Sequence, residues 1–200
     1  MTEEERKKAV EQAKKYVEKN PDKDPKLYDP TGKGHSGTKG APGEAADCSG
    51  LVSNSIKAAG IKDPNHGPGP NGVKNIVENT RSVETSNAQS GNIVTFKVGA
   101  DANAHVGMIT KVDPDNGNIT MIQSGKSTGP TTVTFDPNAK NTYWGEKFEG
   151  VRAWDTPDPV TQKSNNSTQT TTSTTNSTRT EMPSRSTNST FLWFLKGFSR

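Results

Sequence analysis

A single cysteine and a later histidine are the residues of this chain best suited to covalent chemistry. Cys48 begins a run patterned like a helix, and Asp47 before it is a natural N-cap. Unpaired backbone N–H groups and the positive end of the helix dipole favour a thiolate in a first turn. The sequence therefore predicts a lowered pKa for Cys48. A lone cysteine is more often a small buried apolar residue, so this prediction needs support from the rest of the chain.

His105 provides that support as a candidate base. It begins the strand-like run 105–112, which starts 57 residues after Cys48. A cysteine at a helix start and a histidine on a later strand form a nucleophile and base arrangement. The pair predicts attack of sulfur on a carbonyl carbon.

Three segments of the chain resemble the NlpC-type peptidases, which are papain-like cysteine enzymes that cut the peptide stems of the bacterial cell wall. They are D-C-S-G-L-V at 47–52, the run 89–96, and H-V-G-M-I at 105–109. The resemblance covers residues 9–154. It implies that Cys48 is the nucleophile, that His105 is the base, and that a polar residue on the next strand orients the histidine. Gln123 holds that third place; its amide can accept the ring N–H but cannot stabilise a charged ring as a carboxylate would.

The resemblance also implies a substrate and the residues that contact it. The substrate would be the peptide stem of peptidoglycan, cut near the γ-D-glutamyl link to a diamino acid, with no metal or organic cofactor. Asp47 and Ser49 match the acid and hydroxyl that recognise the free amine end of the stem. As an alternative, Asp47 is a helix cap and nothing more, and one carboxylate can do both. Tyr28 is a candidate for the tyrosine that the family carries before the cysteine, at a stretched spacing, and stays outside the predicted catalytic set.

The turn between the two strands predicts how His105 and Gln123 are paired. A turn centred on Pro114 would set the two residues directly opposite each other, with side chains on the same face of the sheet. A tighter two-residue turn at Asn116-Gly117 would instead set Gln123 opposite Thr110. We expect the first of these registers.

Periodicity elsewhere predicts the elements that position these residues. A helix is expected over 3–19, with a capping box at its start. A long Gly- and Pro-rich loop should follow over 20–46, and a short helix over 73–79. The expected strands are 92–97, 105–112, 118–123, 131–135 and 150–154. The predicted fold is α+β and papain-like over residues 1–160, with N-terminal helices packed on a five- to six-stranded antiparallel sheet.

Composition separates a tail from this domain. The 200 residues are 27% apolar, which is low for a wholly globular chain of this length. The stretch 161–190 is almost entirely Ser, Thr, Asn and Gln and cannot bury enough apolar surface to offset the entropy of ordering. We therefore expect a disordered tail over 161–200 with a short apolar tip at 191–195, too short for an integral membrane span. The near-neutral charge of residues 1–160 argues against nucleic acid as a partner.

Together these features predict a cysteine peptidase or amidase that hydrolyses peptide stems of peptidoglycan. The N-terminus has no apolar region of a signal peptide, which predicts secretion or delivery to the cell envelope by a non-classical route. A lysin, a delivered antibacterial effector with an immunity or delivery protein, and a fragment of a larger exported protein all fit, and we expect a monomer. Two alternatives stay open: a papain-like toxin or amidase acting on another amide or ester, and a non-enzymatic wall-binding module.

Overall fold

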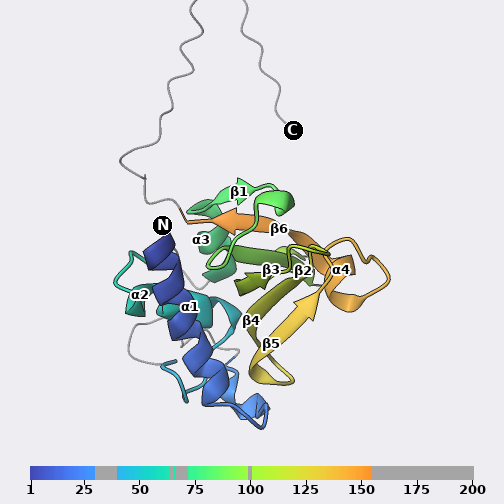
Figure 1. Ribbon diagram of the computed structural model, residues 1–200. Helices are drawn as coiled ribbons and strands as arrows, with labels where there is room; N and C mark the ends of the chain where they lie inside the picture. Colours follow the sequence, from blue (N-terminus) through green and yellow to red (C-terminus); the bar gives the residue numbers. More distant parts are fainter. Residues whose placement is uncertain (30–39, 64, 66–71, 99–100, 155–200) are drawn as a thin grey trace, which may run out of the picture. The chain divides into compact units, whose positions relative to one another are not determined.

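A six-stranded antiparallel sheet lies at the centre of this protein, with helices on both of its faces (Figure 1). The computed structural model describes residues 1–29, 40–63, 65, 72–98 and 101–154. The chain divides into two units, Met1–Thr161 and Gln162–Arg200. The second unit, which contains the predicted disordered tail and its apolar tip, lies outside the described residues.

The elements follow one another in the order expected for an α+β domain, with helices mostly before strands. In chain order they are α1 (Glu3–Glu18), η1 (Pro25–Leu27), α2 (Cys48–Ala58), α3 (Gly72–Glu78), β1 (Arg81–Val83), η3 (Thr85–Asn87), β2 (Ile93–Val98), β3 (Asp101–Val112), β4 (Ile119–Gly125), β5 (Gly129–Phe135), α4 (Tyr143–Lys147) and β6 (Phe148–Ala153). The sheet order is β1-β6-β2-β3-β4-β5. The predicted α+β fold with a five- to six-stranded antiparallel sheet is confirmed. The short β1 and α4 were not predicted.

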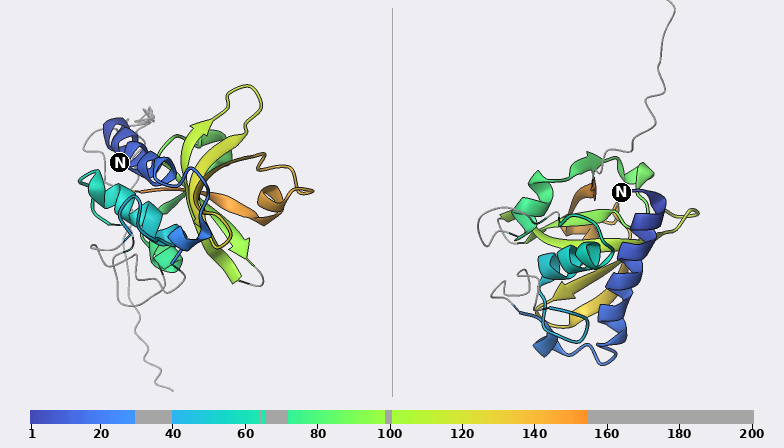
Figure 2. Two further views of the ribbon diagram at one scale, coloured as in Figure 1. Left: turned by 90° about the horizontal axis from the view of Figure 1, so that it is seen from below. Right: turned by 90° about the vertical axis from the view of Figure 1, so that its left-hand side faces the viewer.

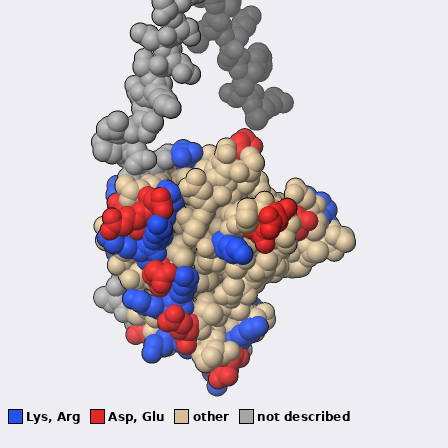
Figure 3. Space-filling model, viewed as in Figure 1, with Lys and Arg blue, Asp and Glu red and all other residues tan. Residues whose placement is uncertain are grey.

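Helix α1 shows how local signals define an element here. Thr2 and Glu5 form the predicted capping box, in which the Glu5 N–H donates to Thr2 Oγ1 at 3.2 Å and the Thr2 N–H donates to Glu5 Oε2 at 2.7 Å. One side of the helix is buried through Ala9, Val10, Ala13 and Tyr16. Lys and Glu side chains mix along the exposed side (Figure 3), where ion pairs such as Lys7–Glu3 are solvated and contribute little to stability.

Two apolar clusters lie on opposite faces of the sheet. Helices α1 and α2 lie on one side and α4 on the other, as Figure 1 and the left view of Figure 2 show. The first cluster joins α1 and α2 to inward-facing residues of β2, β3 and β4, including Ile56 of α2 and Met108 of β3. The second cluster contains Phe96 and Phe135, and the partly buried rings of Trp144 and Phe148 pack against it. The face covered by α1 and α2 is therefore mainly aliphatic, whereas the face toward α4 is rich in aromatic rings.

The hairpin between β3 and β4 adopts neither of the two predicted registers. Met108 pairs with Ile122, and one step further along this ladder Gln123 comes opposite Gly107. Two features set the observed pairing. In the turn, Gly117 is left-handed (φ 73°) and its N–H donates to Asp113 O at 2.9 Å, and beyond the turn the register shifts between Ile109 and Lys111. The predicted direct pairing of His105 with Gln123 is therefore wrong by two residues. Because side chains alternate between faces with a period of two, both residues still share one face.

Candidate active site

Cys48, His105 and Gln123 line one cavity of about 610 Å³. They come from three separate elements: the first residue of α2, the strand β3 and the strand β4. Further wall residues come from the β4–β5 turn and from α4. The three residues that the sequence singled out for catalysis are thus brought together at one opening.

The start of α2 is built as the sequence predicted. The Asp47 carboxylate caps the helix, since Asp47 Oδ1 accepts from the Gly50 N–H at 2.6 Å. The Ser49 hydroxyl donates to the same oxygen at 2.9 Å. Cys48 follows in the first turn, with 7% of its surface exposed. The cap holds the helix start, and with it the sulfur, in a defined position at the cavity.

The pKa of the thiol moves in the direction opposite to the prediction. Burial raises the pKa of Cys48 to about 12, and the negative charge of Asp47 adds to the rise. Backbone hydrogen bonds at Val106 and in the first turn lower the pKa, but their effect is smaller than that of burial. The predicted lowering of the Cys48 pKa is therefore wrong, because desolvation of the sulfur outweighs the backbone hydrogen bonds that favour the thiolate.

The imidazole of His105 is held in its neutral form. Burial lowers the pKa of His105 to about 4, while the Gln123 side chain and the Asp47 charge oppose that change. Its ring packs against aromatic neighbours, with centroid distances of 5.7 Å to Trp144 and 6.1 Å to Phe96. At neutral pH the cavity therefore holds a thiol and an uncharged imidazole.

Gln123 lies beside His105 on the same face of the sheet. Because it is opposite Gly107, it is a diagonal neighbour of His105, a spacing that long side chains can bridge. A Cβ at Gly107 would come within 3.4 Å of the Gln123 Cβ and 2.7 Å of the Met121 sulfur, so the glycine leaves room for this packing. Within the described part of the chain, His105 Nε2 and Gln123 Oε1 are buried without a hydrogen-bond partner.

Two hydrogen bonds join the segment before α2 to its neighbours. The Ser124 hydroxyl donates to Ala46 O at 2.7 Å, which ties β4 to the residue that precedes the cap. The Ala46 N–H donates to Leu27 O at 3.1 Å, which ties the same segment to η1. Tyr28 follows Leu27 and lines the cavity. Burial raises the pKa of Tyr28, and the nearby Cys48 and Asp47 raise it further, so this tyrosine belongs to the site despite its stretched spacing.

Not every predicted site residue reaches the cavity wall. Among the described residues, Asp47 and Ser49 do not line the cavity, and Ser49 is 2% exposed. Conversely, Tyr143 and Trp144 of α4 line it and were missed from the sequence. Their only sequence signal is a pair of adjacent aromatic residues in an otherwise polar stretch.

The comparison with known protein families identifies the family of this chain. Residues 32–153 match the model of the NlpC/P60 family, and the chain belongs to that family. Its members are generally peptidases or amidases of the cell wall, with papain-like domains. The resemblance deduced from the cysteine and histidine segments is thereby confirmed.

Two solved structures are similar to this chain. One is described as similar to lipoprotein, NLP/P60 family, from Staphylococcus aureus subsp. aureus Mu50, with 19% identity, a TM-score of 0.49 and 77% of this chain covered. The other is the P60 domain of an antigen from M. avium subspecies paratuberculosis, with 16% identity, a TM-score of 0.43, and coverage of 72% of this chain and 95% of that one. This chain spans 42% of the staphylococcal chain. No curated protein matches the chain.

Two further properties of the described residues are the grouping of possible metal ligands and the length of apolar helices. Among them, no three His, Cys, Asp or Glu side chains are grouped so that they could hold a metal ion. Over the same residues, no helix is both long and apolar enough to cross a membrane.

Proposed function

We propose that this chain is a cysteine peptidase that hydrolyses the peptide stems of peptidoglycan, near the γ-D-glutamyl link to a diamino acid. The observation that carries the proposal is the meeting of Cys48, His105 and Gln123 at one cavity in a member of the NlpC/P60 family. The stem peptide as substrate comes from the family resemblance, and the thiol, imidazole and amide side chains that line the cavity support amide hydrolysis as the reaction.

In the proposed reaction, the Cys48 thiol and the His105 imidazole are both neutral before the substrate is attacked, and charge develops only during the attack. The Cys48 sulfur bonds to the amide carbon while its proton passes to His105. His105 then gives that proton to the leaving nitrogen as the C–N bond breaks, which leaves a thioester on Cys48. Water, deprotonated by His105, attacks the thioester and releases the acid and the free thiol. The backbone N–H of Cys48, at the helix start, is suited to stabilise the oxyanion.

Gln123 is proposed to orient the base. Catalytic hydrogen bonds are often loose in the free enzyme and tighten in the substrate complex. Here Gln123 Oε1 is an acceptor and His105 Nε2 is a ring nitrogen, and both are buried without a partner in the described part of the chain. A bond between them would fix the tautomer that leaves Nδ1 to receive the thiol proton.

Asp47 and Ser49 are proposed to contribute to recognition of the free amine end of the stem. Asp47 already acts as the helix cap through Oδ1, and its negative charge influences the pKa of both Cys48 and His105. A substrate ammonium near this carboxylate would offset the charge that raises the thiol pKa. Substrate binding would in this way favour proton transfer from Cys48.

The proposal is tested by digesting purified sacculi with the wild type and with Cys48→Ala, and comparing product masses. We expect new peptide ends at the γ-D-glutamyl link with the wild type only. Unchanged stem peptides with both proteins would contradict the proposed substrate. A product of a different bond would point instead to a papain-like amidase of other specificity.

The raised pKa of the Cys48 thiol favours one other function, a wall-binding module without catalysis. Alkylation of Cys48 near neutral pH does not separate the two functions, because a neutral thiol reacts slowly in either case. Turnover does separate them. The wild type and Cys48→Ala are sedimented with sacculi, and product release is measured in the same samples. Binding of both proteins without any product would support the binding module.

A further inference from the structure

The wall of the cavity carries an excess of positive charge. Lys97 of β2, Lys126 of the β4–β5 turn and Lys147 of α4 all line it. Among the described residues, no Asp or Glu side chain lines the cavity. Three separate segments of the fold therefore bring lysine residues to the opening that also holds Cys48.

These charges are available to a ligand. Lys97 and Lys126 are exposed and form no ion pair with a described residue. Lys147 pairs with Glu146 at 2.6 Å, but the Glu146 carboxylate is exposed, and an exposed pair of this kind is weak. A concave site lined by one sign of charge concentrates ligands of the opposite sign.

We propose that Lys97, Lys126 and Lys147 form a carboxylate-binding subsite, and that this enzyme prefers stem peptides whose glutamyl α-carboxyl group is free over those in which it is amidated. This inference rests on the proposed function, because the substrate is the same stem. A γ-linked glutamyl residue keeps its α-carboxyl group outside the peptide chain and close to the bond that is cut. Lysine ammonium groups bind such a carboxylate by charge-assisted hydrogen bonds, which a neutral amide cannot match.

The test uses two synthetic stem peptides that are identical except for a free or an amidated α-carboxyl group. For the wild type we expect kcat/KM to be about tenfold higher with the free acid, since each exposed charge contact is worth a few-fold in binding. In the double variant Lys97→Gln/Lys126→Gln, the ratio between the two peptides should fall to about two or less, through KM rather than kcat.

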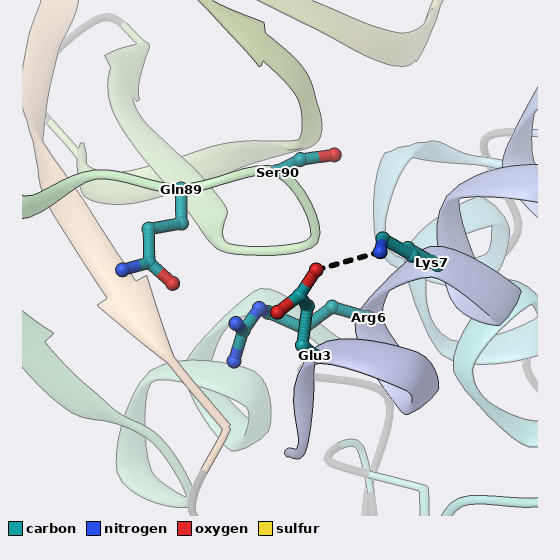
Figure 4. A pocket seen from close by; sticks show the side chains of 5 residues that line it. All are labelled: Glu3, Arg6, Lys7, Gln89 and Ser90. Atoms are coloured by element: carbon teal, nitrogen blue, oxygen red, sulfur yellow. Dashed lines mark ion pairs between the residues drawn. The ribbon is translucent and has the colours of Figure 1, made fainter.

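A matched control is a lysine at a different cavity. Lys7 lies at a separate opening of about 390 Å³ lined by Glu3, Arg6, Lys7, Gln89 and Ser90 (Figure 4). It pairs with Glu3 at 2.6 Å and is well exposed. Lys7→Gln removes the same charge from the protein, so the ratio between the two peptides should stay at the wild-type value. An equal fall in Lys7→Gln would show a nonspecific charge effect and overturn the subsite.

A variant that should increase the preference for the free acid provides a further test. Glu146→Gln removes the carboxylate that pairs with Lys147 and leaves the lysine free for the ligand. The preference for the free acid should then rise about twofold above that of the wild type. A fall in the preference would contradict the role of Lys147.

Failure of this inference can be told from failure of the proposed function. Equal cleavage of both peptides by the wild type would overturn the subsite and leave the peptidase intact. If neither peptide is cleaved, calorimetric binding to Cys48→Ala decides: tighter binding of the free acid, lost in the double lysine variant, supports the subsite alone. Equal or absent binding of the two peptides would overturn it.

Discussion

The two faces of the sheet differ in what they contribute to this protein. The face under α1 and α2 is packed with aliphatic side chains, and Cys48 belongs to that cluster. The face toward α4 is packed with aromatic rings, and the His105 ring lies against Phe96 and Trp144 there. The candidate nucleophile and base thus come from different layers. They meet because both line the cavity that also receives Gln123.

The difference suggests a division of tasks. The aliphatic face positions a sulfur at a capped helix start and supplies much of the apolar burial that stabilises the domain. The aromatic face controls the imidazole, since burial keeps its pKa low and its ring is fixed by neighbouring rings. Changes on the first face should therefore affect mainly stability, and changes on the second should affect mainly turnover.

The largest effect is expected from His105→Ala. Removal of a general base should lower kcat/KM on stem peptides about a thousandfold, with a circular dichroism spectrum like that of the wild type. Steady-state product release checks the rate, and thermal unfolding checks the fold. Retention of more than a tenth of the wild-type rate would show that another group takes the thiol proton.

A buried residue of the aliphatic face should behave in the opposite way. Ile56 is fully buried in α2, and Ile56→Ala should lower the free energy of unfolding by about 3 kcal/mol through lost burial and a new cavity. The folded fraction should retain a kcat close to that of the wild type. Urea denaturation and kinetics at low temperature measure the two quantities. A large loss of kcat with unchanged stability would break the proposed division.

Acid should destabilise the wild type through His105. Its pKa is about 4 when folded and 6.5 without the influence of the fold, so the unfolded chain binds more protons between these values. Stability should fall as the pH falls from about 6.5 to 4, by on the order of 3 kcal/mol. Urea denaturation at several pH values should show this loss in the wild type and not in His105→Ala, whose carboxylates are the same. If the free energy of unfolding falls equally with pH in the wild type and in His105→Ala, His105 is not held neutral by the fold.

A smaller effect is expected from Trp144→Leu on the aromatic face. Leucine retains apolar volume but removes the ring that lies 5.7 Å from the His105 ring. Water should then approach the imidazole, its pKa should move up toward 6.5, and kcat should fall about tenfold. NMR titration of the imidazole gives the pKa, and kinetics gives kcat. Tyr143→Leu is the matched control, because Tyr143 is 60% exposed; an equal loss of kcat there would contradict a specific role of Trp144.

The smallest effect is expected from Asp47→Asn. Asparagine caps helices about as well as aspartate, so stability should change by less than about 0.5 kcal/mol. The pKa of Cys48 should fall, because the Asp47 charge that raises it is removed. If the carboxylate also binds the substrate amine, KM should rise about fivefold. An unchanged KM would reduce Asp47 to a helix cap.

Local signals made part of this structure predictable from the sequence. The capping box at Thr2 and the cap at Asp47 act within one helical turn, so their residue types are sufficient to define both helix starts. The alternation of apolar residues located β2 through β6, and the NlpC-type segments around Cys48 and His105 indicated the family. The shared face of His105 and Gln123 also followed, because it depends only on a period of two.

Other features depend on the folded chain as a whole. The exact pairing of β3 with β4 depends on the left-handed turn at Gly117 and on the register shift between Ile109 and Lys111. Neither of the two registers considered from the sequence includes that shift. The pKa of Cys48 is set by the neighbours that exclude water from the sulfur, and these come from distant segments. The same holds for Trp144 beside His105 and for the lysines around the cavity. The sequence alone determines where helices start, which side chains of a strand share a face, and to which family the chain belongs. These signals lie within a few residues, repeat with a period of two, or are short segments typical of the family. Only tertiary packing decides how deeply a side chain is buried and which charges surround the cavity, since both depend on residues far apart in the chain.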